Sequence, residues 1–274
     1  MMCLECGCAE VDEVKIDGKP MKHRRDRGHS HGDCGHRHDR DKKEQKTGSA
    51  REIGIKRNIL DKNNQTARHN REHLKAQGVF TMNLISAPGS GKTAILEKLI
   101  SDYGSEFPVY VIEGDQQTDN DAKRIKAAGA DALQINTGAA CHLDAEMIHR
   151  ALRKIDLKDR KFLIIENVGN MVCPTAYDLG EDLKVAIVSC PEGEDKPVKY
   201  PDLMLTADVL LINKIDLIPY LDFNLRTCIG LSKKVNPQIT VFPVSAKTGE
   251  GLDLFATWLK QRAGLSSCLR VSPI

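Results

Sequence analysis

The sequence predicts an α/β fold in which a mostly parallel sheet has helices on both faces and follows a disordered, histidine-rich N-terminal tail. Two observations lead to this prediction. From residue 53 onward, short runs that are apolar throughout alternate with amphipathic segments, the pattern of a parallel sheet buried on both faces. Residues 21–51 instead contain a single large apolar side chain, Met21, so apolar burial cannot offset the entropy of ordering them.

The expected elements follow these runs in chain order. A helix leads into the domain from Ile53 and stops near Gly78, since glycine is common just past helix ends. Further helices are expected at 93–100, 119–128, 143–155, 225–235 and 252–262. Strands are expected at 79–85, 109–112, 132–135, 162–165, 185–188, 209–212 and 239–244. We therefore predict a largely disordered, metal-binding region over 1–51 and one α/β domain over 52–274.

The composition excludes several classes of protein. The chain has 274 residues, of which 41% are hydrophobic and 28% charged, so it can bury a sizeable core. Residues 21–51 hold ten Lys/Arg against five Asp/Glu, and the remainder is mildly acidic, which gives no reason to expect nucleic acid. We expect no membrane span and no secretory leader, hence a cytoplasmic protein. The nine cysteines then indicate thiols and metal ligands rather than disulfides.

A phosphate-binding loop is expected between the strand at 79–85 and the helix at 93–100. Residues 86–93 read SAPGSGKT, with Ser86 where such loops usually have their first glycine. Three small residues let backbone N–H groups turn toward phosphate oxygens: Gly89, Ser90 and Gly91. Lys92 would neutralise the β- and γ-phosphates, and Thr93 would offer its hydroxyl to Mg²⁺. This segment predicts a P-loop NTPase.

A guanine-binding segment follows the strand at 209–212. Residues 213–216 read NKID, and the carboxylate of Asp216 can accept two hydrogen bonds from guanine that adenine cannot supply. A Ser-Ala-Lys segment follows the next strand, in the order found in guanine-nucleotide-binding proteins. We therefore expect GTP or GDP to contact Asn213, Lys214, Asp216, Ser245, Ala246 and Lys247.

Acidic residues end two strands beside the phosphate loop. Glu166 precedes Gly169, at the place where GTPases have an acidic Mg²⁺-side residue and a glycine that senses the γ-phosphate. Because Glu replaces the more common Asp, contact with Mg²⁺ is expected directly or through a water molecule. The segment Glu113–Asp115 would supply the other Mg²⁺ carboxylate or position the attacking water, and Asp115 is the acid we assign. Lys92, Thr93, Asp115 and Glu166 are thus the expected catalytic residues.

Two N-terminal segments have metal-ligating residues. Cys3, Cys6 and Cys8 form a CxxCGC motif whose thiols can surround one soft metal ion. With a terminal amine as fourth ligand, the three thiols would suit square-planar Ni²⁺, and tetrahedral Zn²⁺ is the alternative. Met1 and Met2 both precede the motif, so the amine of Met1 is not directly beside Cys3. The tail would bind Ni²⁺ or Zn²⁺ weakly, or be only a solvated basic segment, and its histidines are His29, His31, His36 and His38.

A third group of ligands lies inside the domain. Cys141 and His142 are adjacent, and Cys173 follows Gly169 by four residues. A metal ion on these side chains would be tied to the nucleotide state. Taken singly, each residue is as well explained by an ordinary buried thiol or a histidine at a helix start.

Together these motifs resemble the hydrogenase nickel-incorporation GTPases, the HypB family. The similarity covers residues 53–262 and the terminal motif, with shared segments at 3–8, 86–93, 113–118, 136–138, 141–144, 166–174, 192–197, 213–216 and 245–247. It implies a slow GTPase that dimerises around nucleotide and delivers nickel to the large subunit of NiFe-hydrogenase. It also implies a HypA-like metallochaperone partner and often a prolyl-isomerase chaperone.

The resemblance also implies roles for the cysteines. Cys141, His142 and Cys173 would form a low-affinity Ni/Zn site at the dimer interface, and the terminal cysteines would form the tight nickel site.

Three other functions compete with this one. A urease-accessory GTPase also handles nickel, but its Cys-Pro-His arrangement differs from Cys141-His142 with Cys173-Pro174 here. A nickel storage or buffer protein with a regulatory GTPase core would use the same tail and terminal cysteines. A small-molecule P-loop kinase is disfavoured, because it has no use for the NKID segment.

Overall fold

The computed structural model describes residues 15–17, 19–20, 44–106, 108–116 and 120–265. Within them nine strands form one sheet in the order β2-β1-β5-β4-β6-β3-β7-β8-β9. The strands are β1 (Lys15–Ile16), β2 (Lys19–Pro20), β3 (Phe80–Ser86), β4 (Val109–Asp115), β5 (Asp131–Asn136), β6 (Phe162–Glu166), β7 (Leu183–Ser189), β8 (Val209–Asn213) and β9 (Thr240–Pro243).

The helices alternate with the strands as predicted. They are α1 (Glu44–Ala76), α2 (Lys92–Tyr103), α3 (Asn120–Ala127), α4 (Ala145–Leu152), α5 (Lys196–Lys199), α6 (Pro201–Thr206), α7 (Leu225–Val235) and α8 (Leu252–Arg262). Three 3₁₀ turns lie between them: η1 (Cys173–Ala176), η2 (Cys190–Glu192) and η3 (Ile215–Tyr220). The short α5 and α6 had no counterpart in the expected elements.

The sheet is parallel except at one edge. β3 pairs in parallel with β6 on one side and with β7 on the other, which places the strand before the phosphate loop near the middle of the sheet. β1 pairs antiparallel with both β2 and β5. These two-residue strands lack an apolar run, so the sequence pattern did not reveal them. The predicted, mostly parallel sheet is confirmed.

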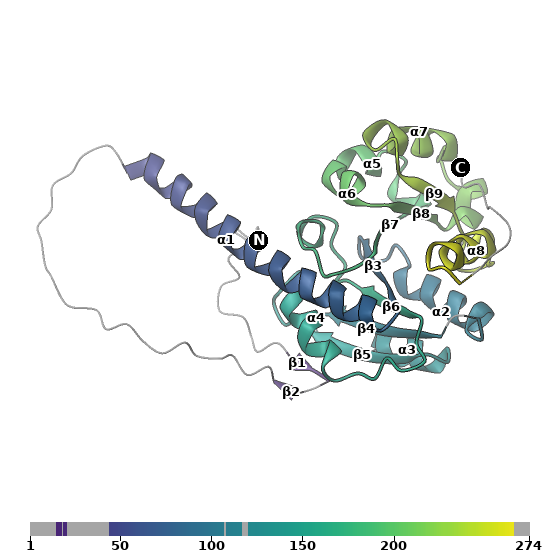
Figure 1. The fold of residues 1–274 in the computed structure, drawn as a ribbon. Coiled ribbons are helices and arrows are strands. Elements are labelled where there is room, and N and C mark those ends of the chain that lie inside the picture. Colours follow the sequence, from purple (N-terminus) through teal and green to yellow (C-terminus); the bar gives the residue numbers. More distant parts are fainter. Residues whose placement is uncertain (1–14, 18, 21–43, 107, 117–119, 266–274) are drawn as a thin grey trace, which may run out of the picture.

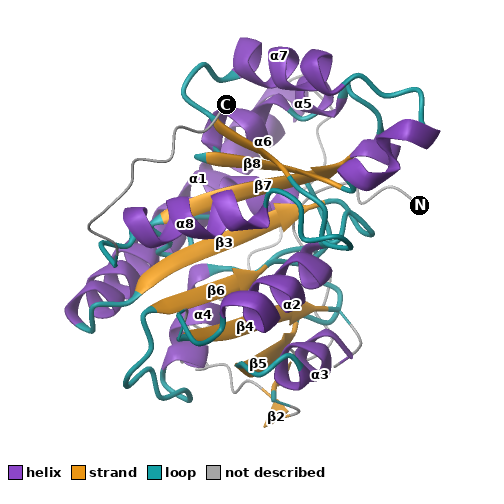
Figure 2. Cartoon of the chain, turned by 90° about the vertical axis from the view of Figure 1, so that its right-hand side faces the viewer, coloured by secondary structure: helices purple, strands orange, loops and turns teal. Residues whose placement is uncertain are grey.

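Helices cover both faces of the sheet. α2, α3 and α8 lie on the face that Figure 2 shows in front. α1 and α4 cover β4, β5 and β6 from behind, and α6 and α7 cover β7 and β8 on that same side. Neighbouring residues of β3 point to opposite faces: Leu84 packs in the core with α2 and α8, whereas Ile85 packs with α6. Such two-sided burial explains why the strands are apolar throughout.

The first long helix differs from its prediction. α1 begins at Glu44, earlier than Ile53, so the expected boundary at residue 52 falls inside it and the predicted disorder does not include 44–51. Its N-terminal half extends away from the sheet, and its C-terminal half packs against α4 (Figure 1). Once packing has formed a helix, each added polar residue extends it at little cost, which explains the early start. No helix in the described ranges is long and apolar enough to cross a membrane.

Candidate functional site

The phosphate loop turns sharply between β3 and α2. Gly91 has a φ of 97°, in the left-handed region that favours glycine, and a Cβ there would lie 2.4 Å from Asn213 Nδ2. Asn213 approaches so closely because its Nδ2 donates a hydrogen bond to the Ser90 carbonyl at 2.8 Å. The predicted glycine is therefore required both by the backbone and by the neighbouring guanine-binding segment.

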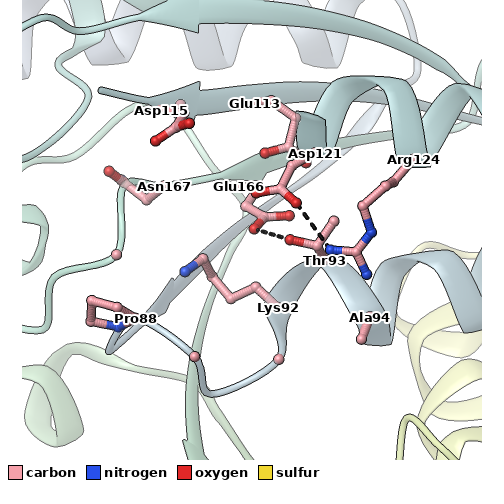
Figure 3. A pocket seen from close by; sticks show the side chains of 14 residues that line it. Pro88, Lys92, Thr93, Ala94, Glu113, Asp115, Asp121, Arg124, Glu166 and Asn167 are labelled. Carbon is pink, nitrogen blue, oxygen red and sulfur yellow. Dashed lines mark hydrogen bonds and ion pairs between the residues drawn. The ribbon is translucent and has the colours of Figure 1, made fainter. Parts of the chain in front are cut away.

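The lysine and the threonine of the loop are both held by other side chains. Lys92 Nζ donates to Ser86 Oγ at 2.9 Å, so the serine in place of the usual glycine anchors the lysine. Thr93 Oγ1 donates to Glu166 Oε1 at 2.9 Å (Figure 3). Ser86 in turn donates to the Ala87 carbonyl at 2.8 Å. The structure thus brings Lys92, Thr93 and Glu166 together, as the sequence predicted.

Two buried carboxyl groups face each other behind the threonine. Glu113, at 3% exposure, lies on β4, and Glu166, at 4%, ends β6. Burial raises the pKa of Glu113 well above its usual range, and the negative charge of Glu166 and a hydrogen bond to it raise this pKa further. Burial raises the pKa of Glu166 as well. Glu113 and Asp115 lie on the same face of β4 and line the same pocket. Sequence reasoning assigned Asp115 and left Glu113 without a role, since only the pairing of β4 with β6 shows that Glu113 lies opposite Glu166.

This acidic corner has the chemistry of a Mg²⁺ site. One oxygen of each acid, Glu113 Oε1 and Glu166 Oε2, is buried without a hydrogen-bond partner. Asp115 lines the same pocket, which has a volume of about 340 Å³ and opens beside Thr93 (Figure 3). Carboxylate and hydroxyl oxygens are the ligands that Mg²⁺ prefers, and unpaired buried oxygens are costly without a cation. These residues therefore fit the ion.

Two residues of α3 complete the pocket and were missed from the sequence. Asp121 and Arg124 both line it. The Arg124 guanidinium donates to both Glu97 oxygens at 2.9 and 2.6 Å and to Asp121 Oδ1 at 3.1 Å. In the sequence they belong to an ordinary polar helix, and no motif marks them.

A second pocket adjoins the first and contains the predicted guanine-binding residues. Its volume is about 410 Å³, and it shares Gly91 and Ala94 with the phosphate pocket. It is lined by Asn213, Lys214, Asp216, Leu217, Ala246 and Lys247 as well. Ser245 Oγ donates to Asp216 Oδ1 at 2.6 Å, and Lys214 Nζ donates to the Gly89 carbonyl at 2.7 Å. The Asp216 carboxylate is thereby fixed in orientation beside an apolar slot.

The third predicted group is also assembled. The ligand atoms of Cys141, His142 and Cys173 all lie within 4.8 Å of one another. The His142 ring packs on Tyr177, with ring centroids 4.0 Å apart, and burial lowers the pKa of His142. The imidazole is therefore neutral at physiological pH and available as a ligand. Cys173 starts η1, where the Asn170 side chain accepts from the Cys173 backbone N–H at 3.3 Å.

A buried asparagine joins the cysteine–histidine cluster to the nucleotide pocket. Asn167, at 1% exposure, directly follows Glu166 and lines the phosphate pocket. Its Oδ1 accepts from the backbone N–H of Leu143 at 3.1 Å and of Val168 at 3.0 Å. Leu143 is the residue after His142, so one side chain connects the two sites. Sequence reasoning gave Asn167 no separate role, because its partner is 24 positions away in the chain.

The remaining predicted ligands lie outside the described residues. These are Cys3, Cys6, Cys8, His29, His31, His36 and His38.

Comparisons with known proteins agree with this geometry. The family model described as "CobW/HypB/UreG, nucleotide-binding domain" matches residues 80–243. The hydrogenase maturation factor HypB of Azotobacter chroococcum is 49% identical over 225 residues, which cover 82% of this chain and 74% of that protein. The hydrogenase/urease maturation factor HypB of Helicobacter hepaticus is 40% identical over 214 residues, covering 77% and 88%.

A solved structure is similar over nearly the same region. It is HypB from Helicobacter pylori in complex with nickel, with a TM-score of 0.70 and 39% identity, and the match covers 76% of this chain and 99% of that one. By sequence and by structure, this chain belongs to the HypB branch of the CobW/HypB/UreG family.

Proposed function

We propose that this protein is a GTP-hydrolysing nickel metallochaperone that assists nickel insertion into the large subunit of NiFe-hydrogenase. The observation that supports this most directly is the Asn167 side chain, which connects a phosphate pocket to a thiol–imidazole cluster in one domain. A nucleotide switch joined to a metal site is what a metal-delivery GTPase needs.

In the proposed hydrolysis, the chain mainly positions groups and stabilises charge. Lys92 would move from Ser86 to the β- and γ-phosphate oxygens, where it offsets the charge that develops on the leaving phosphate. Thr93, Glu166 and Asp115 would hold Mg²⁺, and the ion would supply positive charge that offsets the charge of the phosphates. Asp216 would accept from the guanine base and so exclude adenine nucleotides. Asp115 would also orient the attacking water, since it lines the pocket on the opposite side from the lysine (Figure 3).

The proposed cargo site is the cysteine–histidine cluster. Two thiolates and a neutral imidazole suit Ni²⁺ or Zn²⁺, and three ligands leave at least one position open. Beside Cys173, the apolar side chain of Val172 is 64% exposed. A second copy of the chain across a two-fold axis would cover this residue and supply the missing ligands. Dimerisation, a HypA-like donor of nickel and a prolyl-isomerase partner are further parts of this proposal.

Nickel titration of the full chain tests the proposal. The terminal thiols are removed by Cys3→Ser, Cys6→Ser and Cys8→Ser, and Ni²⁺ affinity is measured with GDP and with a non-hydrolysable GTP analogue. We expect the two affinities to differ by roughly 5- to 150-fold, the usual range for coupled sites. Adding Cys141→Ala should abolish the nucleotide-sensitive binding. Equal affinities in both nucleotide states would refute the coupling, and unchanged binding in Cys141→Ala would refute the site.

A further inference from the structure

The ligands of the cysteine–histidine cluster come from two separate loops. Cys141 and His142 lie in the first loop, residues 137–144, which runs from β5 to α4. Cys173 lies in the second loop, residues 167–182, which runs from β6 to β7. Three ligands from two loops bind one ion well only while the loops keep their spacing. The apparent affinity for metal therefore falls with the fraction of molecules in which the spacing is lost.

Two asparagines of α1 hold both loops at once, through hydrogen bonds to the second loop and to the residue directly after the first. We propose that Asn63 and Asn70 are positioning residues of the cluster, which set its affinity for metal by fixing the spacing of the two loops. This inference rests on the proposed cargo site and adds to it two residues that do not touch the metal.

Asn63 joins the two loops through its single amide group. Its Oδ1 accepts from the backbone N–H of Ala145 at 2.9 Å, and its Nδ2 donates to the carbonyl of Asp178 at 2.8 Å. Ala145 is the third residue after His142. Asp178 is the fifth residue after Cys173. Ala145 also begins α4, where backbone N–H groups have no partner within the helix, so the asparagine supplies an acceptor that this end of the loop needs.

Asn70 makes a second bridge two helical turns later. Its Nδ2 donates to the carbonyl of Ala145 at 2.9 Å and to the carbonyl of Leu179 at 3.2 Å. Residues seven positions apart lie on the same face of a helix, about 10.5 Å apart along its axis. The two asparagines thus bind both backbone groups of Ala145 and the carbonyls of two adjacent residues of the second loop. Because each loop is held at two backbone groups, its direction is fixed as well as its position.

The burial of the two amides indicates that these hydrogen bonds are their purpose. Asn63 is 8% exposed and Asn70 is fully buried, on the helix face that also buries Ala67 and Leu74. Asparagine is mostly exposed in proteins, and a buried amide without partners costs free energy. Apart from the ring of His149, which lies 3.2 Å from Asn70 Oδ1, the partners of both amides are the backbone groups described above.

The second loop lies too close to α1 to move independently of it. Gly180 has a φ of 97°, and a Cβ there would lie 2.7 Å from the carbonyl oxygen of Ala67 and 2.8 Å from Asn70 Cβ. The guanidinium of Arg71 holds the same loop, through the carboxylate of Asp178 at 2.7 Å. No side chain fits between the helix and the loop at Gly180, so the position of α1 determines the position of the loop.

Co²⁺ titration of the full chain tests this proposal, because thiolate ligands give bound Co²⁺ an absorption that reports both the affinity and the ligand set. The terminal thiols are removed as above, and the cluster signal is the absorption that Cys141→Ala abolishes. Asn63→Ala and Asn70→Ala should each weaken Co²⁺ binding at the cluster by roughly 10-fold, the lower end of what residues around metal ligands contribute. At saturating Co²⁺ both variants should have the parent's spectrum, since all three ligands remain.

Two control variants separate positioning from a general loss of stability. Asn236→Ala removes an amide of the same kind, whose Nδ2 donates to the carbonyls of Met204 at 2.8 Å and Ala207 at 3.1 Å. It should lower the free energy of unfolding and leave the affinity for Co²⁺ unchanged, because it holds neither loop of the cluster. Asn64→Ala replaces the exposed neighbour of Asn63 in α1 and should change neither quantity.

Three results would overturn the proposal. They are parental Co²⁺ affinity in Asn63→Ala, an equal loss of affinity in Asn236→Ala, and an altered spectrum at saturation, which would mean that the ligand set itself has changed. GDP binding verifies that each variant folds, and should Asn70→Ala not fold, Asn63→Ala decides. If Cys141→Ala keeps the full absorption, the proposed cargo site is refuted; if it loses the absorption while Asn63→Ala binds normally, only the positioning role is refuted.

Discussion

Replacing Asn167 by alanine should disconnect the nucleotide pocket from the cysteine–histidine cluster while leaving the ligands of both sites in place. The Asn167 side chain ligates neither a metal nor the phosphate groups in the proposed mechanism. It accepts from the backbone of Leu143, beside His142, and from Val168, in the segment expected to sense the γ-phosphate. Without this side chain, a movement of Val168 on GTP binding should no longer shift Leu143.

The structure sets the size of the effect on stability. Alanine leaves two buried backbone N–H groups without an acceptor and also removes the hydrogen bond from Nδ2 to Asn83 at 3.3 Å. Each unsatisfied buried group costs about 1–3 kcal/mol, so the free energy of unfolding should fall by roughly 2–6 kcal/mol. The coupling free energy between nucleotide and nickel, about 1–3 kcal/mol in such systems, should fall toward zero.

The assay combines urea unfolding with nickel titration in the GDP and GTP-analogue states. Asn83→Ala is the matched control, because Asn83 is fully buried in the same network and donates to Glu181 Oε1 at 3.2 Å without contacting Leu143. It should lose similar stability and keep the nucleotide dependence of nickel affinity. The reasoning fails if Asn167→Ala keeps the parent's nucleotide dependence, or if Asn83→Ala loses it to the same extent.

Three further substitutions test single residues of the nucleotide pocket. Asp216→Asn should weaken GTP binding by roughly 100-fold, since two charge-assisted hydrogen bonds are lost, and shift preference toward xanthosine triphosphate; competition between the two nucleotides measures this. Lys92→Ala should lower the GTP hydrolysis rate by about 10²–10³ with an unchanged circular dichroism spectrum. Folding raises the pKa of Glu113, so the folded chain binds a proton that the unfolded chain releases above pH 4.5. The contribution of Glu113 to stability should therefore fall as the pH rises above 4.5, by up to about 1.4 kcal/mol per pH unit, and Glu113→Gln should make the slope in urea unfolding at pH 5 to 8 shallower. Burial also raises the pKa of Glu166 and of Glu181, so these two acids should maintain the rest of the slope.

Much of the fold could be predicted because its signals are local. Each of the seven predicted strands occurs, because a strand that is buried on both faces of a parallel sheet consists of consecutive apolar residues. The helices α7 and α8 also have the predicted bounds. The early start of α1 could not be predicted. Its first residues mix good helix formers with Thr47, Gly48 and Ser49, which disfavour a helix, so no local signal marks the start.

The site shows the same division between local and distant causes. The phosphate loop is a single turn of consecutive residues, so a short motif identifies its members Gly91, Lys92 and Thr93. The inward position of Glu113 depends on the register of β4 against β6, where it lies opposite Glu166. The spacing of apolar and polar residues along the sequence does not show which residues of two strands lie opposite each other. The same holds for Asn167, whose partner is on another loop.

The contacts of Leu143 suggest why nucleotide and metal should influence each other at all. A Cβ added to Gly114, between the acids Glu113 and Asp115 of β4, would lie 2.7 Å from Leu143 Cδ1. From β6, Asn167 binds the Leu143 backbone at 3.1 Å. Both strands that present acids to the proposed Mg²⁺ therefore touch the residue next to His142. Close-packed interiors transmit small shifts rather than absorb them, so we expect that drawing the acids toward a cation moves this loop. If GTP changes nickel affinity in this way, linkage requires that nickel change GTP affinity by the same factor.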